Sequence, residues 1–404
     1  MVNQLPQGWK EEELGKLADV IAGQSPEGIY YNTVGDGTPF YQGKSEFQEM
    51  YLGKPTKWTT KVTKLAKRND ILMSVRAPVG PVNITQEDIC IGRGLAAITA
   101  KSMLLQLYLF YHLRYLEDKI SGTNGAVFAS ISKREIEQIK ITYPIDKEEQ
   151  DYIVKTLDAV AEIIRLHKET IQLTKDLIPA IFHEMFGDPI TNPKGWEILS
   201  LDNIITQINN GYNPSKKDFG TGIPFVTVNN LYDGLSIDYD SLDKVMVSNK
   251  QIQKYKLNYG DICFVRSSVK REGIGQASAY LSNQDAIFGG FVIRVTPKET
   301  FNPIFLSEYF QTESMRNIII NKSVTGVMTN INQPALLSIP VLNVPFSMQE
   351  EFADKVEQIN KYIAAQQEEL EQFETLFQSL LQEAFTGVLT WNYPRKECHD
   401  KKDK

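Results

Sequence analysis

Residues 153–185, IVKTLDAVAEIIRLHKETIQLTKDLIPAIFHEM, place mostly apolar side chains at alternating spacings of four and three residues. Residues 352–384, FADKVEQINKYIAAQQEELEQFETLFQSLLQEA, keep the same spacing, and each such position lies 199 residues after its counterpart. Spacing of this kind, held over about five heptads, is typical of a coiled-coil seam. The predicted seam consists of Ile153, Leu157, Val160, Ile164, His167, Ile171, Thr174, Ile178, Ile181 and Met185, and of Phe352, Val356, Ile359, Ile363, Gln366, Leu370, Phe373, Phe377, Leu380 and Ala384.

Each stretch predicts a helix of about 38 residues, roughly 57 Å long at 1.5 Å per residue. Such a helix could pack on its own globular domain or against another rod. The long run of heptads favours a rod, and the simplest one is the other helix of the chain. Because twofold pseudo-symmetry requires each half to meet the other in the same way, we expect an antiparallel pair. His167 and Gln366, at equivalent seam positions, are expected to fix the register.

The rest of the chain is duplicated as well. Four features recur in the same order: PQGW at 6–9 and PKGW at 193–196, GTPF at 37–40 and GIPF at 222–225, NDI at 69–71 and GDI at 260–262, and a glycine 19 residues before a proline, at Gly125 and Gly326. Arg76 and Arg266 follow the third feature and are therefore predicted to correspond. Repeats of this length indicate two copies of one structural unit.

We therefore predict an α+β fold in which two pseudo-repeated globular domains of mixed α/β structure are joined by two long helices that form an antiparallel coiled coil. Gly187 and Gly387 follow the seams, where a helix C-cap favours glycine. The expected divisions are a first globular domain at 1–146, a first helix at 147–187, a second domain at 188–346, a second helix at 347–387 and a tail at 388–404.

Charge is segregated along the chain, whose net charge is −7. The two helical stretches, 148–185 and 350–384, carry −4 and −7, so the remainder is net positive. Bases gather at corresponding places in the two copies, with +5 over residues 44–76 and +6 over residues 244–271. Such patches attract phosphates through counterion release and field steering. The alternative is a solvated lysine face, which two matching patches make less favoured.

Groups that contact nucleic acid lie near these patches. Amides, arginines and small hydroxyls contact base edges, while lysines position the backbone. Loops rich in Asn, Gly and Ser are also ordinary turns, so a plain turn surface is the alternative. The candidates are Tyr30, Gln42, Lys44, Lys57, Lys61, Arg76, Arg93, Thr123 and Asn124 in the first copy, and Tyr212, Asn213, Lys216, Asn229, Asn230, Arg266, Ser267, Lys270, Arg271, Lys322, Thr325 and Asn330 in the second.

Other kinds of site are not indicated. Cys90, Cys263 and Cys398 are odd in number and far apart, and the four histidines form no metal-binding pair, so neither a disulfide framework nor a metal site is expected. No apolar run is long enough to cross a membrane, and no secretory signal is visible, so we expect a cytoplasmic protein. The segment 37–45 has one residue too many for a phosphate-binding loop. No methyl-transfer or hydrolase motif occurs, so no catalytic residue is assigned.

The doubled motifs resemble the DNA specificity (S) subunits of type I restriction–modification systems. The resemblance covers about residues 4–390 and rests on the two PxGW motifs, on Ile131-Ser132-Lys133 and Glu149-Gln150-x-x-Ile153, and on the closing segments at 184–189 and 383–387. The second copy departs from the pattern, because Gln349-Glu350 stands where the first has Glu149-Gln150.

The resemblance implies that each domain is a target recognition domain for one half of a split target in double-stranded DNA. The helices would set the gap and dock two methyltransferase (modification) subunits, with restriction (ATP-dependent nuclease) subunits completing the complex. S-adenosylmethionine, ATP and Mg²⁺ would belong to those partners, and this chain would hold no cofactor. Two alternatives remain: a protein-binding scaffold built on a dimerisation rod, and an enzyme with a degenerate site.

Overall fold

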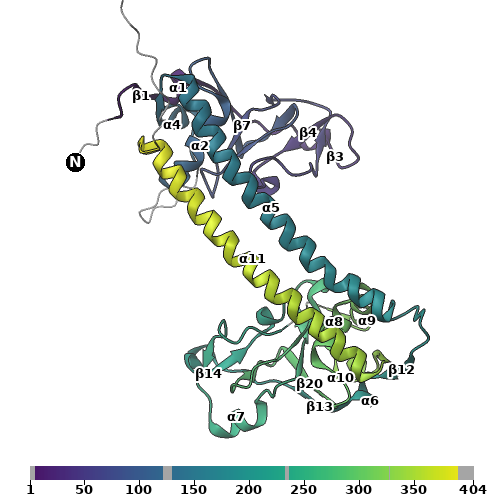
Figure 1. Ribbon diagram of the computed structural model, residues 1–404. Coiled ribbons are helices and arrows are strands. Elements are labelled where there is room, and N and C mark those ends of the chain that lie inside the picture. The colour runs from purple at the N-terminus through teal and green to yellow at the C-terminus, as the bar shows by residue number, and fades with distance from the viewer. Residues whose placement is uncertain (1–4, 122–129, 233–235, 327, 390–404) are drawn as a thin grey trace, which may run out of the picture. The chain divides into compact units, whose positions relative to one another are not determined.

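The computed structural model describes residues 5–121, 130–232, 236–326 and 328–389 (Figure 1). It divides into two compact units, residues 1–168 with 368–404 (unit 1) and residues 169–367 (unit 2). Helix α5 spans Lys147–Phe186 and helix α11 spans Phe346–Thr386, each within one residue of the expected bounds. Each unit therefore consists of one globular head and parts of both long helices.

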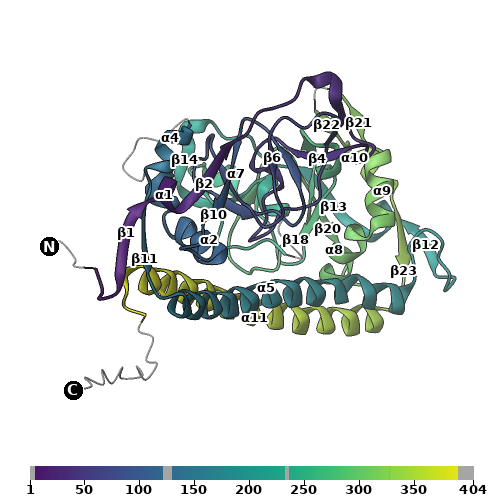
Figure 2. The same ribbon diagram turned by 90° about the horizontal axis from the view of Figure 1, so that it is seen from above.

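Head 1 is the part of unit 1 that precedes α5. Its two ends are tied together because β1 (Trp9–Glu13) pairs antiparallel with β11 (Lys140–Pro144), just before α5 begins (Figure 2). Two further sheets form its body, one with the order β2 (Ala18–Ala22), β10 (Leu95–Ala100), β7 (Ile71–Ser74), β8 (Val82–Ile84), and one with the order β3 (Tyr31–Asn32), β5 (Trp58–Thr59), β4 (Thr38–Tyr41), β9 (Ile89–Ile91), β6 (Leu65–Ala66). Its helices are α1 (Leu14–Leu17), α2 (Gln106–Tyr115), α3 (Glu117–Ser121) and α4 (Lys133–Glu137), with 3₁₀ turns η1 (Gly28–Tyr30) and η2 (Lys44–Glu46).

Head 2 is the part of unit 2 between the long helices, and it repeats this plan. The sheets have the orders β12 (Glu197–Ser200), β23 (Pro340–Asn343); β13 (Ile205–Asn210), β20 (Val292–Pro297), β16 (Ile262–Val265), β18 (Ala277–Ala279); β15 (Lys244–Val245), β14 (Phe219–Val226), β19 (Ile287–Phe288); and β17 (Ser267–Ser268), β22 (Thr329–Asn330), β21 (Val324–Thr325). The helices are α6 (Leu201–Ile204), α7 (Asn249–Tyr255), α8 (Pro303–Gln311), α9 (Glu313–Asn321) and α10 (Gln333–Leu337), with 3₁₀ turns η3 (Lys216–Asp218), η4 (Val228–Leu231) and η5 (Arg271–Gly273).

The recurring sequence motifs mark positions where the two heads share a physical requirement. Gly37 and Gly222, the first residues of GTPF and GIPF, have φ of +90° and +113°. A side chain on either would come within 2.3 Å of a carbonyl oxygen on the neighbouring strand, that of Thr59 or Val245. Only glycine tolerates both the positive φ and the nearby carbonyl oxygen. The duplicated motif therefore marks a close approach of two backbone segments.

A buried glutamine anchors each head to the start of its helix. The Gln150 side chain accepts a hydrogen bond from the Leu105 N–H at 2.9 Å and donates to the Pro144 carbonyl. Gln349 makes the same contacts with Asn302 and Val344. The sequence pairing of Gln349-Glu350 with Glu149-Gln150 is therefore off by one residue, since Gln349 corresponds to Gln150. The departure from the family's pattern remains, because Met348 stands where the first copy has Glu149.

All twenty positions of the predicted seam are buried or partly buried. In unit 1, residues early in α5, such as Ile153 and Leu157, share a core with Phe377, near the end of α11. In unit 2, Phe182, near the end of α5, packs on Phe352 at the start of α11, with ring centres 5.5 Å apart. The early part of one helix thus meets the late part of the other in both units, so the helices pair antiparallel as expected.

The helices also pack on the heads, which the seam alone does not predict. Phe186 lies outside the seam spacing but is fully buried against Phe305 of α8, and Phe385 is buried against Tyr108 and His112 of α2. Both packing alternatives raised by the sequence therefore apply: each helix packs on a head and also against the other helix. Each helix has a wider apolar surface than a two-helix coiled coil needs, because it serves a partner helix and a head at once.

Truncating Phe352 tests this shared core. Phe352→Ala is expected to lower the free energy of unfolding by about 3–5 kcal/mol, the usual cost of removing a fully buried phenylalanine. The matched control is Tyr362→Ala on the same helix, where the side chain is 60% exposed and a change within about 0.5 kcal/mol is expected. Urea denaturation of the full chain measures both, and equal effects would contradict the packing described.

Candidate nucleic-acid interface

Backbone contacts between three segments bring four predicted residues of head 1 together. The Gly94 N–H donates to the Gln42 carbonyl at 3.0 Å, and the Val75 N–H donates to the Gly94 carbonyl at 2.9 Å. These bonds place Gln42 and Lys44 beside Arg93 and next to Arg76, and all four side chains are exposed. We call Gln42, Lys44, Arg76 and Arg93 the head-1 patch. It combines three cations with one amide, the groups that contact phosphates and base edges.

Three other predicted residues of head 1 form a separate group at the β3–β5–β4 edge. The Lys61 ammonium lies 4.7 Å from the centre of the Tyr30 ring, close enough for a cation–π contact. The Thr60 N–H donates to the Tyr30 carbonyl, and the Phe40 N–H donates to the Lys57 carbonyl. This group is thus held beside β4, whose end leads into the head-1 patch. Thr123 and Asn124 lie outside the described residues.

In head 2, three predicted residues surround a glycine pair. The Gly290 N–H donates to the Tyr212 carbonyl at 2.8 Å, and Arg266 Nη1 donates to the Gly290 carbonyl at 3.2 Å. A side chain on Gly290 would come within 2.2 Å of Asn213 Oδ1, so Asn213 packs directly over this backbone. We call Tyr212, Asn213 and Arg266 the head-2 patch.

The sheet β17–β22–β21 lies next to the head-2 patch and carries three more predicted residues, Ser267, Thr325 and Asn330. Ser267 is buried, and its hydroxyl donates to Asn330 Oδ1 at 2.5 Å. Ser267 therefore orients the exposed Asn330. Lys270 and Arg271 are exposed on the loop that follows β17.

The remaining predicted residues of head 2 lie on other elements. Lys216 is exposed on η3, and Lys322, after α9, donates to Ser338 Oγ at 2.9 Å. Asn229 and Asn230 both lie on η4, where the Asn230 side-chain oxygen accepts hydrogen bonds from the N–H and hydroxyl of Thr227. The Asn230 amide thus caps this turn, as Asn does in many loops.

The predicted equivalence of Arg76 and Arg266 is wrong. The Ile131 N–H bonds to the Val75 carbonyl, whereas the Ile331 N–H bonds to the Arg266 carbonyl. Arg266 therefore occupies the position of Val75, and Arg76 corresponds to Ser267. The two heads present an arginine from neighbouring positions of the same strand end, so their side chains leave the backbone on opposite sides.

The aspartate shared by the two copies has a structural role. Asp70 accepts hydrogen bonds from the Lys67 N–H and the Thr99 hydroxyl, and Asp261 accepts them from the Asn258 N–H and the Thr296 hydroxyl. Burial raises the pKa of Asp261, while these hydrogen bonds and Arg294, 3.8 Å away, act in the opposite direction. These carboxylates stabilise the turn before β7 in head 1 and before β16 in head 2. We therefore assign them a structural role and no role in binding.

Sequence reasoning missed an ion cluster in unit 1 that links head 1 to both helices. Lys168 Nζ of α5 lies 2.5 Å from Glu49 Oε1 of head 1 and 2.9 Å from Glu374 Oε1 of α11. Burial lowers the pKa of Lys168, but its hydrogen bonds to both carboxylates outweigh this and raise it overall. Because these side chains are half-exposed, their ion pairs contribute little to the free energy of unfolding. They serve mainly to orient head 1 on the two helices within unit 1. Only contacts across the fold could have shown it, because Glu49 is 119 residues away in sequence.

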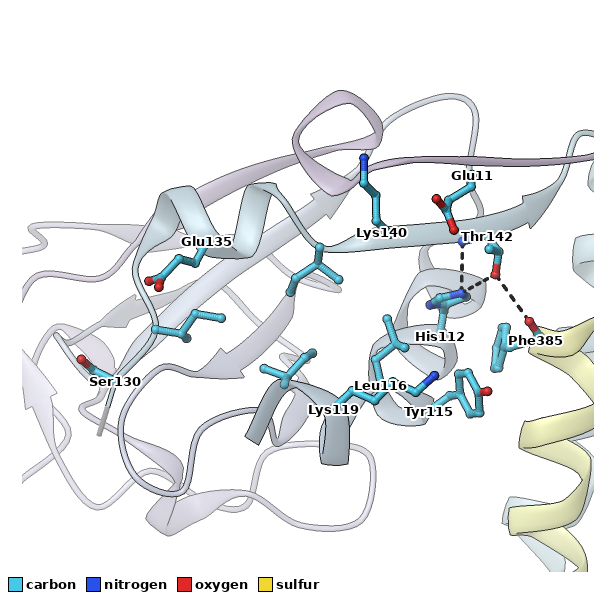
Figure 3. Close-up of a pocket in the computed structure, with 13 residues that line it drawn as sticks. Glu11, His112, Tyr115, Leu116, Lys119, Ser130, Glu135, Lys140, Thr142 and Phe385 are labelled. Carbon is cyan, nitrogen blue, oxygen red and sulfur yellow. Dashed lines mark hydrogen bonds between the residues drawn. The ribbon is translucent and has the colours of Figure 1, made fainter. Parts of the chain in front are cut away.

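A cavity of about 530 Å³ in unit 1 lies between α2, α3, α4 and the end of α11 (Figure 3). His112 reaches its wall, where Nε2 accepts a hydrogen bond from the Thr142 N–H at 3.2 Å. The ring proton therefore resides on Nδ1, which is buried and has no partner among the described residues. Burial is the main cause that lowers the pKa of His112 to about 3.

Neither a metal site nor a membrane span is found in the part of the chain that the structure describes. Within it, no cluster of three or more histidine, cysteine, aspartate or glutamate side chains could hold a metal ion. None of its helices is both long and apolar enough to cross a bilayer. Cys90 and Cys263 are buried and unpaired, and Cys398 lies outside the described residues.

The family model for the type I restriction modification DNA specificity domain matches residues 6–175 and 193–375. The chain therefore belongs to this family and carries two copies of its domain.

Three curated relatives are specificity subunits by name. The "Putative type I restriction enzyme MjaX specificity subunit" of Methanocaldococcus jannaschii is 44% identical over 184 residues, which are 44% of this chain and 43% of that protein. The MjaIX specificity subunit of the same organism is 23% identical over 66% of this chain and 68% of its own length. The EcoKI specificity subunit of Escherichia coli is 24% identical over 68% of this chain and 63% of its own length. The first match thus spans under half of that relative.

Two solved structures share the fold. The type I restriction–modification S subunit of M. genitalium aligns with a TM-score of 0.51 at 15% identity, over 95% of this chain and 98% of that chain. A chain from a study of complex assembly and conformational transition of the type I R-M system aligns with a TM-score of 0.59 at 17% identity, over 96% of this chain and all of the other. The predicted two-domain α+β fold is confirmed.

Acidification tests the neutral, buried state of His112. Its pKa is lower in the folded protein than the unfolded value of 6.5, so the unfolded chain takes up a proton first as the pH falls. Stability is therefore present above pH 6.5 and decreases below it, by about 1 kcal/mol between pH 6.5 and 5.5. His112→Gln, which keeps an acceptor for Thr142, is expected to remove this part of the pH dependence in urea titrations. The exposed His183→Gln should leave it unchanged; if His112→Gln does so too, the assignment fails.

Proposed function

We propose that this chain is the non-catalytic DNA-recognition subunit of a type I restriction–modification complex, and that each head contacts one half of a bipartite target in double-stranded DNA. The observation that carries the proposal is that each head gathers an arginine and an amide at the same strand end, with exposed lysines nearby. Membership of the specificity-domain family supports it. Lysines would position the backbone, while Arg76, Arg93, Arg266 and the amides would contact base edges.

The long helices would set the gap between the half-sites. Both α5 and α11 contribute to the cores of both units, which supports a role for their length in this spacing. Their surplus of acidic residues would disfavour phosphate contacts along the helices and leave the heads as the attractive surfaces.

Partner subunits would supply all the chemistry. Exposed apolar side chains on the helices, including Leu173 and Leu177 on α5 at 60% and 49% exposure, support docking of two methyltransferase subunits. Restriction subunits would join that assembly, and S-adenosylmethionine, ATP and Mg²⁺ would bind to the partners. DNA as the substrate makes the cytoplasm the expected compartment.

Substitution of Arg76 tests base contact by head 1. Arg76→Ala, in the complex with its methyltransferase subunits, is expected to relax selectivity at one half-site by about 10-fold, since a specific arginine–base contact contributes about 1–3 kcal/mol. Arg68→Ala is the matched control, because this exposed arginine lies at the other end of β7 and should not alter selectivity. Salt-dependent binding to duplexes altered in either half measures both, and equal relaxation of the two halves by Arg76→Ala would contradict the assignment.

A change in helix length tests whether the helices set the gap between the half-sites. One heptad inserted at equivalent positions of both helices should lengthen the preferred gap by about 10 Å, or roughly three base pairs, at 1.5 Å per residue. Mapping methylated adenines in cells that express the variant measures the gap, and an unchanged gap would refute the role. Indifference of the complex to DNA at low salt would instead favour the scaffold alternative, and methyl transfer or cleavage by the purified chain would favour the enzyme alternative.

A further inference from the structure

The outer face of the sheet β17–β22–β21 in head 2 carries an amide and a valine side by side. Residues directly opposite each other on neighbouring strands have their side chains on the same face. The register places Ser267 opposite Asn330, and Asn330 opposite Val324. Val324 is 69% exposed, and Val269, which directly follows β17, is 82% exposed. Valine in a sheet usually packs against neighbouring side chains. These two valines do not, so their side chains are free to contact a partner.

The Asn330 amide is oriented by two internal hydrogen bonds. Its Oδ1 accepts from the Ser267 hydroxyl at 2.5 Å, and its Nδ2 donates to the Met328 carbonyl at 3.0 Å. A side-chain amide has two donor hydrogens and two acceptor lone pairs, so one of each remains. That combination matches the N7 acceptor and N6 donor of adenine in the major groove.

The loop after β17 is held in place, which prepares this face for binding. Arg316 Nη2 donates to the carbonyls of Glu272 and Ile274, both at 2.7 Å. Gly275 has a φ of +65°, and a side chain there would collide with Ile319. The loop that carries Val269 therefore loses little conformational freedom on contact with a ligand.

Exposed cations near this face indicate which kind of partner binds it. Lys270 and Arg271 directly follow Val269, and Lys322 lies two residues before Val324; all three are exposed, as is one acidic neighbour, Glu272. A small apolar and amide surface with cations nearby is complementary to duplex DNA, whose phosphates flank the base edges. A protein partner with an apolar docking surface would gain little from these cations.

We propose that Asn330, Val324 and Val269 select an adenine–thymine pair in the half-site of head 2. Asn330 binds the N6 and N7 edge of adenine, and the valine methyl groups contact the C5-methyl group of thymine in the same or the adjacent pair. This inference rests on the proposed function of the chain. It goes further, because it assigns a base pair and adds two residues that are not basic or polar.

Deoxyuridine, which pairs like thymine but lacks the methyl group, is the direct probe. The full chain in complex with its methyltransferase subunits is titrated with duplexes of the mapped target in which each thymine of the half-site is replaced in turn. One replacement is expected to weaken binding about fourfold, the effect of losing one buried methyl group. Val324→Ala or Val269→Ala should weaken binding to the thymine duplex by a similar factor and abolish the difference between the duplexes.

Two controls separate the possible outcomes. Val34→Ala, at an 85% exposed valine of unit 1, should keep the full sensitivity to deoxyuridine at this half-site. Asn330→Ala should weaken binding to the adenine duplex more than to one with 7-deazaadenine at that position, which lacks the N7 acceptor. Selective binding that is indifferent to every deoxyuridine replacement overturns this inference and leaves the proposed function standing. Loss of all sequence selectivity in the unmodified complex overturns the proposed function itself.

Discussion

The antiparallel contact between α5 and α11 is the constraint on which the rest of the structure depends. In unit 1 the seam residues Ile153 and Phe377 belong to the same core as the head helix α2, and in unit 2 Phe352 and Phe182 belong to the core of α8. The larger hydrophobic core of each head includes residues of both long helices, whereas smaller clusters around Leu72 in head 1 and Phe288 in head 2 do not. The apolar surface that pairs the helices therefore also completes both heads, and loss of the pairing would expose aromatic side chains in each of them.

Comparison of the two heads separates supporting residues from candidate contact residues. The supporting features recur in kind: Gly37 with Gly222 at a close backbone approach, and the buried pairs Asp70 with Asp261 and Gln150 with Gln349. The candidate contact positions differ, as where the exposed Arg76 corresponds to the buried Ser267. A duplicated scaffold with divergent exposed positions is what two different half-sites would require, because backbone positions can stay fixed while base contacts change.

The sequence allowed the helices to be predicted almost to the residue, because a heptad period is a local property that one chain displays by itself. The candidate contact residues were predicted only as a set of residue types. Shared residue type matches Arg266 with Arg76, whereas the offset between Asp70 and Asp261 already aligns Arg266 with Val75. Hydrogen bonds such as that of Asn230 to Thr227, and ion pairs such as that of Lys168 to Glu49, depend on geometry that a sequence does not contain.

The interleaving of the two units has a consequence for how the chain folds during synthesis. Unit 2 is a continuous segment, whereas unit 1 joins the first 168 residues to those after 367. The ribosome therefore releases every residue of unit 2 before Phe377, Leu381 and Phe385 emerge to finish the core of unit 1. Head 1 is therefore translated first but completed last. Until the end of α11 has been synthesised, the apolar surface of head 1 that α11 covers stays exposed.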